Sequence, residues 1–328
     1  MVADRLRWGI LGTARINRAL IPPLQGGARH VLRAIASRDK PRAAAYAQQW
    51  NIDVAYGSYE ALIGDPEIDA IYNPLPNSLH AEWTIRAARA GKHVLCEKPL
   101  ALSVSEVDAI ERAARDAGVV VAEAFMYRHH PQTLHLKALV DEGAIGDLVL
   151  VRGSFTFSLM RPMDVRLEVA LGGGSLWDVG CYPVSMARHL IGEEPVRVFG
   201  WQRETPAGID DLFAGTLHFG KVLAQFDCGF CVPLRTHLEV VGTRGAIAVP
   251  MPFKPGLEER MVITRDDGSE TVAVTGQQLY AGEIEDFADA VLLGRAPRVS
   301  LADSRANVAT LVALYESARR GGVPVDLT

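Results

Sequence analysis

The stretch that decides the fold is residues 7–25, RWGILGTARINRALIPPLQ. Its first part, RWGILG (7–12), is a short apolar run that predicts a buried strand, and ARINRALIPPLQ (14–25) predicts a helix. Pro22 and Pro23 should disturb that helix, because proline has no N–H to donate. A strand that turns directly into a helix is the first unit of a parallel α/β sheet.

The same alternation continues to residue 126. Pro41 suits the first turn of a helix, Ser103 to Glu106 predicts a capping box, and Gly91 predicts a C-cap. Strands that alternate with helices pair in parallel through right-handed crossovers, so we expect an α/β fold with a doubly wound parallel sheet. The further strands expected are 30–38, 70–76, 93–99 and 119–126, and the further helices are 40–50, 78–91 and 103–118.

After residue 127 the pattern changes to strand-like segments separated by glycine or charged turns. This predicts a second, α+β domain dominated by antiparallel sheet and flanked by helices. The domains are therefore expected at residues 1–126 and at residues 127–328. The expected strands are 148–159, 196–204, 212–230, 235–250 and 259–274, and the expected helices lie near 131–142, 180–191, 281–293 and 303–320.

Composition excludes several classes of partner. The 328 residues carry a formal net charge of −5, which provides no basic surface for nucleic acid or an anionic membrane. No apolar run reaches the length of a membrane span, and the N-terminal residues lack a secretory pattern, so we expect a cytoplasmic protein. The cysteine pair CGFC (228–231) has no second ligand pair and lies in a strand-like segment, so no metal or redox site is expected.

The first strand–helix turn, GILGTARIN (9–17), approaches a dinucleotide-binding fingerprint. In the G-x-G-x-x-G pattern the three positions are Gly12, Ala14 and Asn17, so only the first glycine is present. The context strengthens this weak signal, since the turn follows a strand and opens a helix whose amides can hold a pyrophosphate. The candidate cofactor-binding residues here are Gly9, Gly12, Thr13, Ala14, Arg15 and Ile16.

The end of the second strand indicates which dinucleotide is bound. An acidic residue there accepts hydrogen bonds from the adenine ribose and favours NAD, but this chain has Ser37 and Arg38. A hydroxyl and a guanidinium suit a 2′-phosphate, so NADP is expected. Asp39, one position later, keeps NAD possible.

Two further strand ends carry polar residues. NPLPNSLHAEW (73–83) offers Pro74, Leu75, Asn77 and His80 as candidates for the cofactor pocket. CEKP (96–99) places Glu97 and Lys98 at the carboxyl end of a parallel strand, where open α/β sheets bind ligands. Lys98 there could stabilise a developing alkoxide, and an inert surface ion pair is the alternative explanation.

Taken together, these residues resemble the glucose–fructose oxidoreductase, inositol dehydrogenase and MocA (Gfo/Idh/MocA) family. The resemblance covers essentially the whole chain, and it is closest to the aldose and dihydrodiol dehydrogenase branch. It implies an NAD(P)-binding Rossmann domain at residues 1–126, followed at residues 127–328 by a domain that binds the substrate and whose large, mainly antiparallel open sheet forms a homodimer or homotetramer. The matching segments, in order, are GILGTARI, NPLPNSLHAEW, GKHVLCEKPLA, EAFMYRHHPQ, GGGSLWDVGCYPV and YAGEIEDFADAV.

The resemblance also implies site residues. The lysine of EKP, Lys98, would work with Asp178 and Tyr182 of the DVGCY segment. A tyrosine is a poor base near neutral pH unless a cation lies nearby, and Lys98 would supply that cation. Tyr182 would then move the proton, and Asp178 would orient the substrate. Arg128 and Tyr280 are candidates for contact with the cofactor and Arg166 with the substrate, although each is nearly as well explained by packing.

The expected function is therefore hydride transfer between a nicotinamide cofactor and a sugar-like alcohol or carbonyl, with NADP-dependent aldose (D-xylose type) 1-dehydrogenase favoured. Alternatives are a trans-dihydrodiol dehydrogenase, a 1,5-anhydrofructose reductase and a nucleotide-sugar ketoreductase. A self-reducing glucose–fructose oxidoreductase is less expected, because such enzymes carry a long N-terminal arm and six residues precede the first strand here. A non-catalytic dinucleotide sensor is the alternative from another class, but the chain retains both Lys98 and Tyr182.

Overall fold

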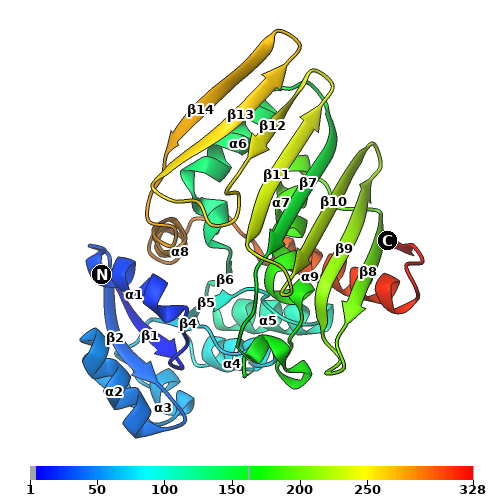
Figure 1. The fold of residues 1–328 in the computed structure, drawn as a ribbon. Coiled ribbons are helices and arrows are strands. Elements are labelled where there is room, and N and C mark those ends of the chain that lie inside the picture. Colours follow the sequence, from blue (N-terminus) through cyan, green and yellow to red (C-terminus); the bar gives the residue numbers. More distant parts are fainter. Residues whose placement is uncertain (1–4, 162, 328) are drawn as a thin grey trace. The chain divides into compact units, whose positions relative to one another are not determined.

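The computed structural model describes residues 5–161 and 163–327, which form two compact units (Figure 1). The N-terminal unit consists of residues up to 129 together with Tyr280–Arg305, and the C-terminal unit consists of His130–Leu279 together with residues from 306 onward. The chain thus returns to the first unit after building most of the second. That residues 1–126 bind the cofactor and residues 127–328 bind the substrate stays a prediction.

The N-terminal unit contains a six-stranded parallel sheet in the order β3-β2-β1-β4-β5-β6. This confirms the doubly wound sheet, whose strand order reverses between β1 and β4, where such sheets bind ligands at the carboxyl ends of the strands. The strands are β1 (Leu6–Leu11), β2 (His30–Ala36), β3 (Val54–Tyr56), β4 (Ala70–Asn73), β5 (His93–Glu97) and β6 (Val121–Ala124).

The helices of this unit begin and end close to where local sequence signals place them. Ser103 Oγ accepts a bond from the Glu106 amide at 3.3 Å, and Glu106 Oε2 accepts one from the Leu102 amide at 3.0 Å, so Ser103 and Glu106 act as the expected capping pair. Gly91 has a φ of +77° but follows the cap residue, Ala90, by one position. The helices are α1 (Asn17–Gly26), α2 (Lys40–Trp50), α3 (Tyr59–Ile63), α4 (Asn77–Arg89), α5 (Val104–Ala117), the 3₁₀ turn η1 (Met126–His129) and α8 (Ala281–Leu293).

Three features of this unit differ from the sequence-based expectation. The short elements β3 and α3 were not predicted, because three half-buried strand residues and five helical residues give no clear periodicity. Helix α8 was expected to flank the second sheet, but it belongs to the N-terminal unit. There the ring centroid of its Phe287 lies 5.2 Å from that of Trp8. Helix α1 also accommodates Pro22 and Pro23 within its length.

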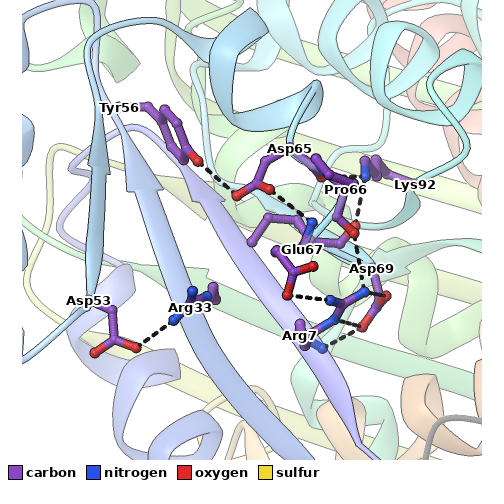
Figure 2. Close-up of polar contacts among 10 residues, drawn as sticks. Arg7, Arg33, Asp53, Tyr56, Asp65, Pro66, Glu67, Asp69 and Lys92 are labelled. Atoms are coloured by element: carbon purple, nitrogen blue, oxygen red, sulfur yellow. Dashed lines mark hydrogen bonds and ion pairs between the residues drawn. The ribbon is translucent and has the colours of Figure 1, made fainter.

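Charged residues at the amino-terminal edge of the parallel sheet are paired with one another (Figure 2). Arg7 donates from Nε and Nη2 to the two carboxylate oxygens of Asp69, at 2.9 and 2.7 Å. Burial disfavours the charge of Asp69, but the bonds from Arg7 outweigh it and hold the pKa of Asp69 below its usual range. Lys92 Nζ donates to the backbone carbonyls of Asp65 and Ile68, both at 2.7 Å. The polar contacts of Arg7 and Lys92 at this edge therefore stabilise the fold.

The C-terminal unit contains a nine-stranded sheet in the order β14-β13-β12-β11-β7-β10-β9-β8-β15. Its neighbouring strands are antiparallel except for β7 and β10, which are parallel, so the predicted mainly antiparallel sheet is confirmed. The strands are β7 (Leu148–Thr156), β8 (Arg197–Glu204), β9 (Asp210–Phe219), β10 (Val222–Gly229), β11 (Arg235–Gly242), β12 (Gly245–Val249), β13 (Glu258–Arg265), β14 (Gly268–Thr275) and β15 (Val325–Asp326).

Helices of this unit pack on the nine-stranded sheet, and α7 is almost wholly buried against β7 and β10. Within the described parts of the chain, no helix combines the length and apolar character needed to cross a membrane. The helical elements are α6 (Pro131–Asp141), the 3₁₀ turns η2 (Val165–Leu167) and η3 (Val169–Leu171), the π-helix η4 (Leu176–Gly180), α7 (Cys181–Ile191) and α9 (Leu301–Arg319), which begins in the N-terminal unit.

Candidate active site

The turn between β1 and α1 has the geometry of a phosphate-binding turn. Gly12 has a φ of +82°, and a Cβ atom there would lie 3.1 Å from a methyl group of Leu75. Asn17 stands where the fingerprint has its third glycine, and its Nδ2 donates to the Gly12 carbonyl at 2.9 Å. The N-cap residue of α1 is Ile16, whose apolar side chain accepts no bond, and the first amides of the helix, those of Asn17 and Arg18, make only long bonds to the carbonyls of Ala14 and Arg15, at 3.3 and 3.4 Å. These residues fit a dinucleotide pyrophosphate.

The other predicted residues of this turn have separate roles. Gly9 lies within β1, where a Cβ atom would come 2.6 Å from Leu62 Cδ2, so it is required for packing against α3. Thr13 Oγ1 accepts a bond from Arg42 Nε at 2.7 Å. Arg15 is exposed, and Ala14 is half-buried at the same turn.

The end of β2 is followed by an exposed positive charge, that of Arg38. Arg38 is exposed, while Ser37 is buried and its Oγ accepts from the Asp39 amide at 3.3 Å. Asp39 caps α2 through Oδ1, which accepts from the Arg42 amide at 3.2 Å. Sequence analysis missed Arg42, although its position in the first turn of the helix that follows Arg38 could have identified it.

His80 ties two segments of the predicted cofactor pocket together. Its Nε2 lies 2.7 Å from the carbonyl oxygen of Leu75 and its Nδ1 lies 2.7 Å from that of Pro99. Burial lowers the pKa of His80 to about 4, although the two carbonyls favour the charged ring. The neutral ring carries one N–H, so His80 donates to one of these two carbonyls and packs against the other, between the loop after β4 and the loop after Lys98. Pro74 and Leu75 are buried beside it, and Asn77 is the first residue of α4.

The carboxyl end of β5 carries the two charged residues of the EKP segment. Glu97 is the last residue of the strand, and Tyr72 of β4 donates to its Oε1 at 2.6 Å. Burial, with the charge of Glu97 next, raises the pKa of Tyr72 well above its usual value, so Tyr72 remains the donor. Lys98 follows directly at the same edge of the sheet. The sequence did not reveal that a buried tyrosine supports Glu97.

Arg128 and Tyr280, the two other predicted cofactor-pocket residues, lie in η1 and at the start of α8. Arg128 lies in η1, directly after β6, and is buried in an ion pair with Asp303 at 3.4 Å. Tyr280 is the buried N-cap residue of α8, and its phenol contributes to the raised pKa of Tyr72. Its place in the cofactor pocket stays a prediction.

Glu283 is a buried acid that sequence analysis missed. It lies in the first turn of α8 with 1% of its surface exposed, and neither carboxyl oxygen has a hydrogen-bond partner among the described residues. Burial, with the charge of Glu97 next, raises the pKa of Glu283 well above its usual value. A neutral carboxylic acid is therefore expected there at neutral pH.

The free energy of unfolding of Glu283→Gln, relative to that of the wild-type chain, is expected to increase as the pH rises. The unfolded chain releases the Glu283 proton above about pH 4.3, whereas the folded chain retains it, so the wild-type chain loses stability above that pH. Glutamine does not titrate. Urea unfolding at about pH 5 and about pH 8 should show a gap between variant and wild type that widens towards the higher pH.

Glu82→Gln provides the matched control, because Glu82 lies on the exposed face of α4 in a surface ion pair with Arg86. Its difference from the wild-type chain should be the same at both pH values. A Glu283→Gln gap that stays constant or narrows as the pH rises would contradict a protonated Glu283.

In the C-terminal unit the structure brings two predicted substrate residues into direct contact. Asp178 lies within the π-helix η4, and its Oδ2 accepts from Arg166 Nε at 2.6 Å. Arg166 Nη1 also donates to Asp164 Oδ1 at 3.2 Å. The charge of Asp178 is the main reason why the pKa of Arg166 is raised above its usual value. Arg166 thus fixes the orientation of the Asp178 carboxylate.

Tyr182 is held by aromatic packing. It is the second residue of α7, with 4% of its surface exposed, and its ring centroid lies 5.2 Å from that of Phe155 and 5.9 Å from that of Phe253. The edge-on contact with Phe155, at an interplanar angle of 72°, restricts the ring to one orientation. Lys98 belongs to the N-terminal unit, and Tyr182, Asp178 and Arg166 belong to the C-terminal unit.

The cysteines form no recognisable site. Cys228 is buried at the end of β10 and Cys231 is exposed beyond it. Across residues 5–161 and 163–327 no group of three or more His, Cys, Asp or Glu side chains has an arrangement that could hold a metal ion.

Comparison with known families gives matches over both units. Residues 6–125 match the model described as an oxidoreductase family with an NAD-binding Rossmann fold, GFO_IDH_MocA. Residues 133–248 match the model of the GFO/IDH/MocA C-terminal domain.

Characterised relatives include a D-xylose 1-dehydrogenase (NADP⁺) from Haloferax volcanii, which is 40% identical over 96% of this chain and 98% of that enzyme. Among solved structures, a 3-ketoreductase from Actinomadura kijaniata in complex with NADP and TDP-benzene superimposes with a TM-score of 0.90 at 31% identity, over 96% of this chain and 98% of the other. An aldose–aldose oxidoreductase from Caulobacter crescentus complexed with glycerol gives a TM-score of 0.91 at 28% identity, over 98% and 100%.

Proposed function

The chain belongs to the Gfo/Idh/MocA family of oxidoreductases, and from this premise we propose that it is an NADP-dependent aldose 1-dehydrogenase of the D-xylose type. The observation that carries this proposal is the 40% identity, over nearly the full length of both chains, to the D-xylose dehydrogenase. The second candidate is a nucleotide-sugar ketoreductase, favoured by the TM-score of 0.90 to the 3-ketoreductase.

The proposed chemistry assigns a separate task to each side chain. Tyr182 exchanges a proton with the reacting oxygen of the substrate, and its aromatic neighbours fix where the phenol points. Lys98 stabilises negative charge on that oxygen and lowers the pKa of the phenol. Asp178 accepts a hydrogen bond from a substrate hydroxyl, in the orientation that Arg166 imposes. A nicotinamide held at the carboxyl edge of the parallel sheet would supply or accept the hydride.

The residues proposed to hold the cofactor follow the carboxyl edge of the parallel sheet. The turn from Gly12 to Ile16 would take the pyrophosphate, and Arg38 with Arg42 would take the 2′-phosphate of NADP. The exposed guanidinium of Arg38, just after β2, supports NADP over NAD. Pro74, Leu75, Asn77, His80, Glu97, Arg128 and Tyr280 remain our proposals for the nicotinamide half of the pocket.

Arg38→Ala is expected to raise the KM for NADP by about 10-fold to 100-fold, because a hydrogen bond to a charged group contributes about 1.5–3 kcal/mol. The KM for NAD, which lacks the 2′-phosphate, should change by less than about twofold on the same basis. Initial rates with each cofactor measure both values.

Arg33→Ala is the control for this prediction, because Arg33 lies on the same strand, β2, and pairs with Asp53 at 3.0 Å (Figure 2). It should leave both KM values near those of the wild-type chain. Equal weakening of NADP and NAD by Arg38→Ala would argue against a 2′-phosphate contact.

The proposed function is tested by following nicotinamide absorbance with a panel of aldoses, polyols, ketoses and nucleotide sugars, each with NADP and NAD. We expect turnover of NADP with aldoses, D-xylose among the best. Preferred turnover of nucleotide sugars would favour the second candidate. Binding of NADPH with no turnover on any of these substrates would contradict an enzymatic function and favour a dinucleotide sensor.

Assembly and location stay predictions. Phe199 and Trp201 on β8 and Leu223 on β10 are exposed, and strand register places all three on one face of the nine-stranded sheet. We propose that this face joins copies of the chain into a homodimer or homotetramer in the cytoplasm. Light scattering on the purified protein tests the assembly, and a monomer at micromolar concentration would contradict it.

A further inference from the structure

The segment that carries Asp178 has an unusual backbone. Leu176–Gly180 forms a π-helix, and α7 with Tyr182 follows it directly. Single π-helical turns are rare, and they occur frequently at functional sites. The position of Asp178 and Tyr182 therefore depends on what holds the start of this turn in place.

One buried carboxylate binds the start of the turn. Asp210, the first residue of β9, has 3% of its surface exposed. Its Oδ2 accepts from Ser175 Oγ at 2.6 Å and from the Leu176 amide at 2.8 Å. Its Oδ1 accepts from Tyr315 Oη of α9 at 2.6 Å. Asp210 thus connects the first residues of the π-helix to β9 and to α9.

The surrounding atoms leave little room for the turn to move. Gly174 has a φ of +121°, and a Cβ atom there would lie 2.3 Å from Asp210 Oδ1 and 2.7 Å from Tyr315 Oη. At the other end, a Cβ atom on Gly180 would lie 2.8 Å from Cys228 Sγ. The ring of Trp177, within the turn, packs 5.5 Å from that of Tyr315. The turn is therefore fixed at both ends and along one side.

We propose that Asp210 is a positioning residue for the reaction: through Ser175, the Leu176 amide and Tyr315 it sets the π-helix so that Asp178 and Tyr182 meet the substrate. This inference rests on the proposed function, because it assumes that Asp178 and Tyr182 act on the substrate. Asp210 itself is buried, and its oxygens are engaged by three donors, so it acts through these neighbours.

Asp210→Asn tests the proposal. The amide has the shape of the carboxylate but no charge and only one oxygen that accepts, so Tyr315, which donates to Oδ1 in the wild-type chain, must turn its hydroxyl to accept from the new N–H₂ group, and the bonds from Ser175 and the Leu176 amide lose their charge assistance. Misplacement of a reacting group by about 1 Å costs about 100-fold, and we expect a fall of that size in kcat. The KM for NADP should stay within about twofold, because the dinucleotide turn belongs to the N-terminal unit.

Hydrogen–deuterium exchange provides a readout that does not depend on turnover. The Leu176 amide, which bonds to Asp210, and the amides of residues 174–182 should exchange faster in Asp210→Asn, while β7 and β11 keep their protection. A substitution that merely weakened the fold would raise exchange across the whole sheet and lower kcat only through the fraction of folded protein.

Asp227→Asn is the matched control. Asp227 lies on the neighbouring strand β10 and also accepts from a serine hydroxyl, that of Ser154, and from Arg235 at 3.0 Å. Asp227 does not bond to Ser175, Leu176 or Tyr315 as Asp210 does. The kcat of Asp227→Asn, and its hydrogen–deuterium exchange in residues 174–182, should therefore match those of the wild-type chain. If Asp210→Asn fails to fold, Ser175→Ala and Tyr315→Phe replace it, each removing one of the three donors.

A folded Asp210→Asn chain with kcat within about threefold of wild type, or with unchanged exchange in residues 174–182, overturns the inference. So does an Asp227→Asn chain that loses kcat to the same degree. Failure of the proposed function looks different, since the wild-type chain would then turn over no sugar or Tyr182→Phe would remain fully active. The exchange measurement still decides whether Asp210 holds the π-helix.

Discussion

Lys98→Met is expected to lower kcat/KM by about 100-fold to 1,000-fold, the usual effect of removing one group that stabilises developing negative charge. Methionine retains most of the length and apolar stem of lysine but cannot donate to an alkoxide. The loss should appear mainly in kcat, because the charge develops in the transition state. The measurement is the initial rate of NADP reduction with the best aldose of the substrate panel.

Lys92→Met is a control that the chain itself offers. Lys92 lies directly before β5 and Lys98 directly after it, so the two lysines mark opposite ends of one strand. The Lys92 ammonium donates to the carbonyls of Asp65 and Ile68 at the amino-terminal edge (Figure 2), so its loss should lower stability. It should leave kcat of the folded protein within about twofold. A Lys98→Met enzyme within about tenfold of wild type would remove Lys98 from the mechanism.

Tyr182→Phe is the second large expected effect, a fall of about 100-fold to 10,000-fold in kcat, which is the usual contribution of a positioned proton donor or acceptor. Phenylalanine retains the ring that packs against Phe155 and Phe253, so the melting temperature should stay close to that of the wild-type chain. The phenol, with a reference pKa near 10, needs a nearby cation to act as a base at neutral pH.

The rate profile against pH gives a second test of Tyr182. The wild-type rate of alcohol oxidation should rise with pH as the phenol loses its proton, and Tyr182→Phe should lose that rise. Tyr56→Phe is the control, because Tyr56 donates to Asp65 at 2.7 Å in the N-terminal unit and has no assigned role in catalysis. A Tyr182→Phe enzyme with a normal rate and an unchanged profile would show that another group moves the proton.

Much of the fold could be predicted from local patterns. The apolar runs and capping signals of residues 7–126 predict a parallel sheet because each strand and helix there has its own periodicity, as the capping pair Ser103 and Glu106 illustrates. The elements β3 and α3 were not predicted, because each is too short to show a hydrophobic periodicity. Helix α8 was found as a helix but assigned to the wrong unit, because its packing against Trp8 joins residues far apart in the chain.

The sequence likewise shows some residues of the candidate site and not others. Gly12, Arg38, Lys98 and Asp178 follow strand ends or family motifs, which a sequence shows directly. The residues that hold them in place were missed, because each acts over a long separation in sequence. Tyr72 supports Glu97 from another strand, and Asp210 binds Ser175 from 35 positions away. The π-helix was also missed, since its residues have no periodicity that distinguishes them from the start of α7.

A crystal structure of the chain with NADP and a bound aldose would test the central claim most directly. The account predicts that Lys98 Nζ and Tyr182 Oη both lie within hydrogen-bond distance, about 2.6–3.2 Å, of the same substrate oxygen. A ternary complex in which either group points away from that oxygen would contradict it.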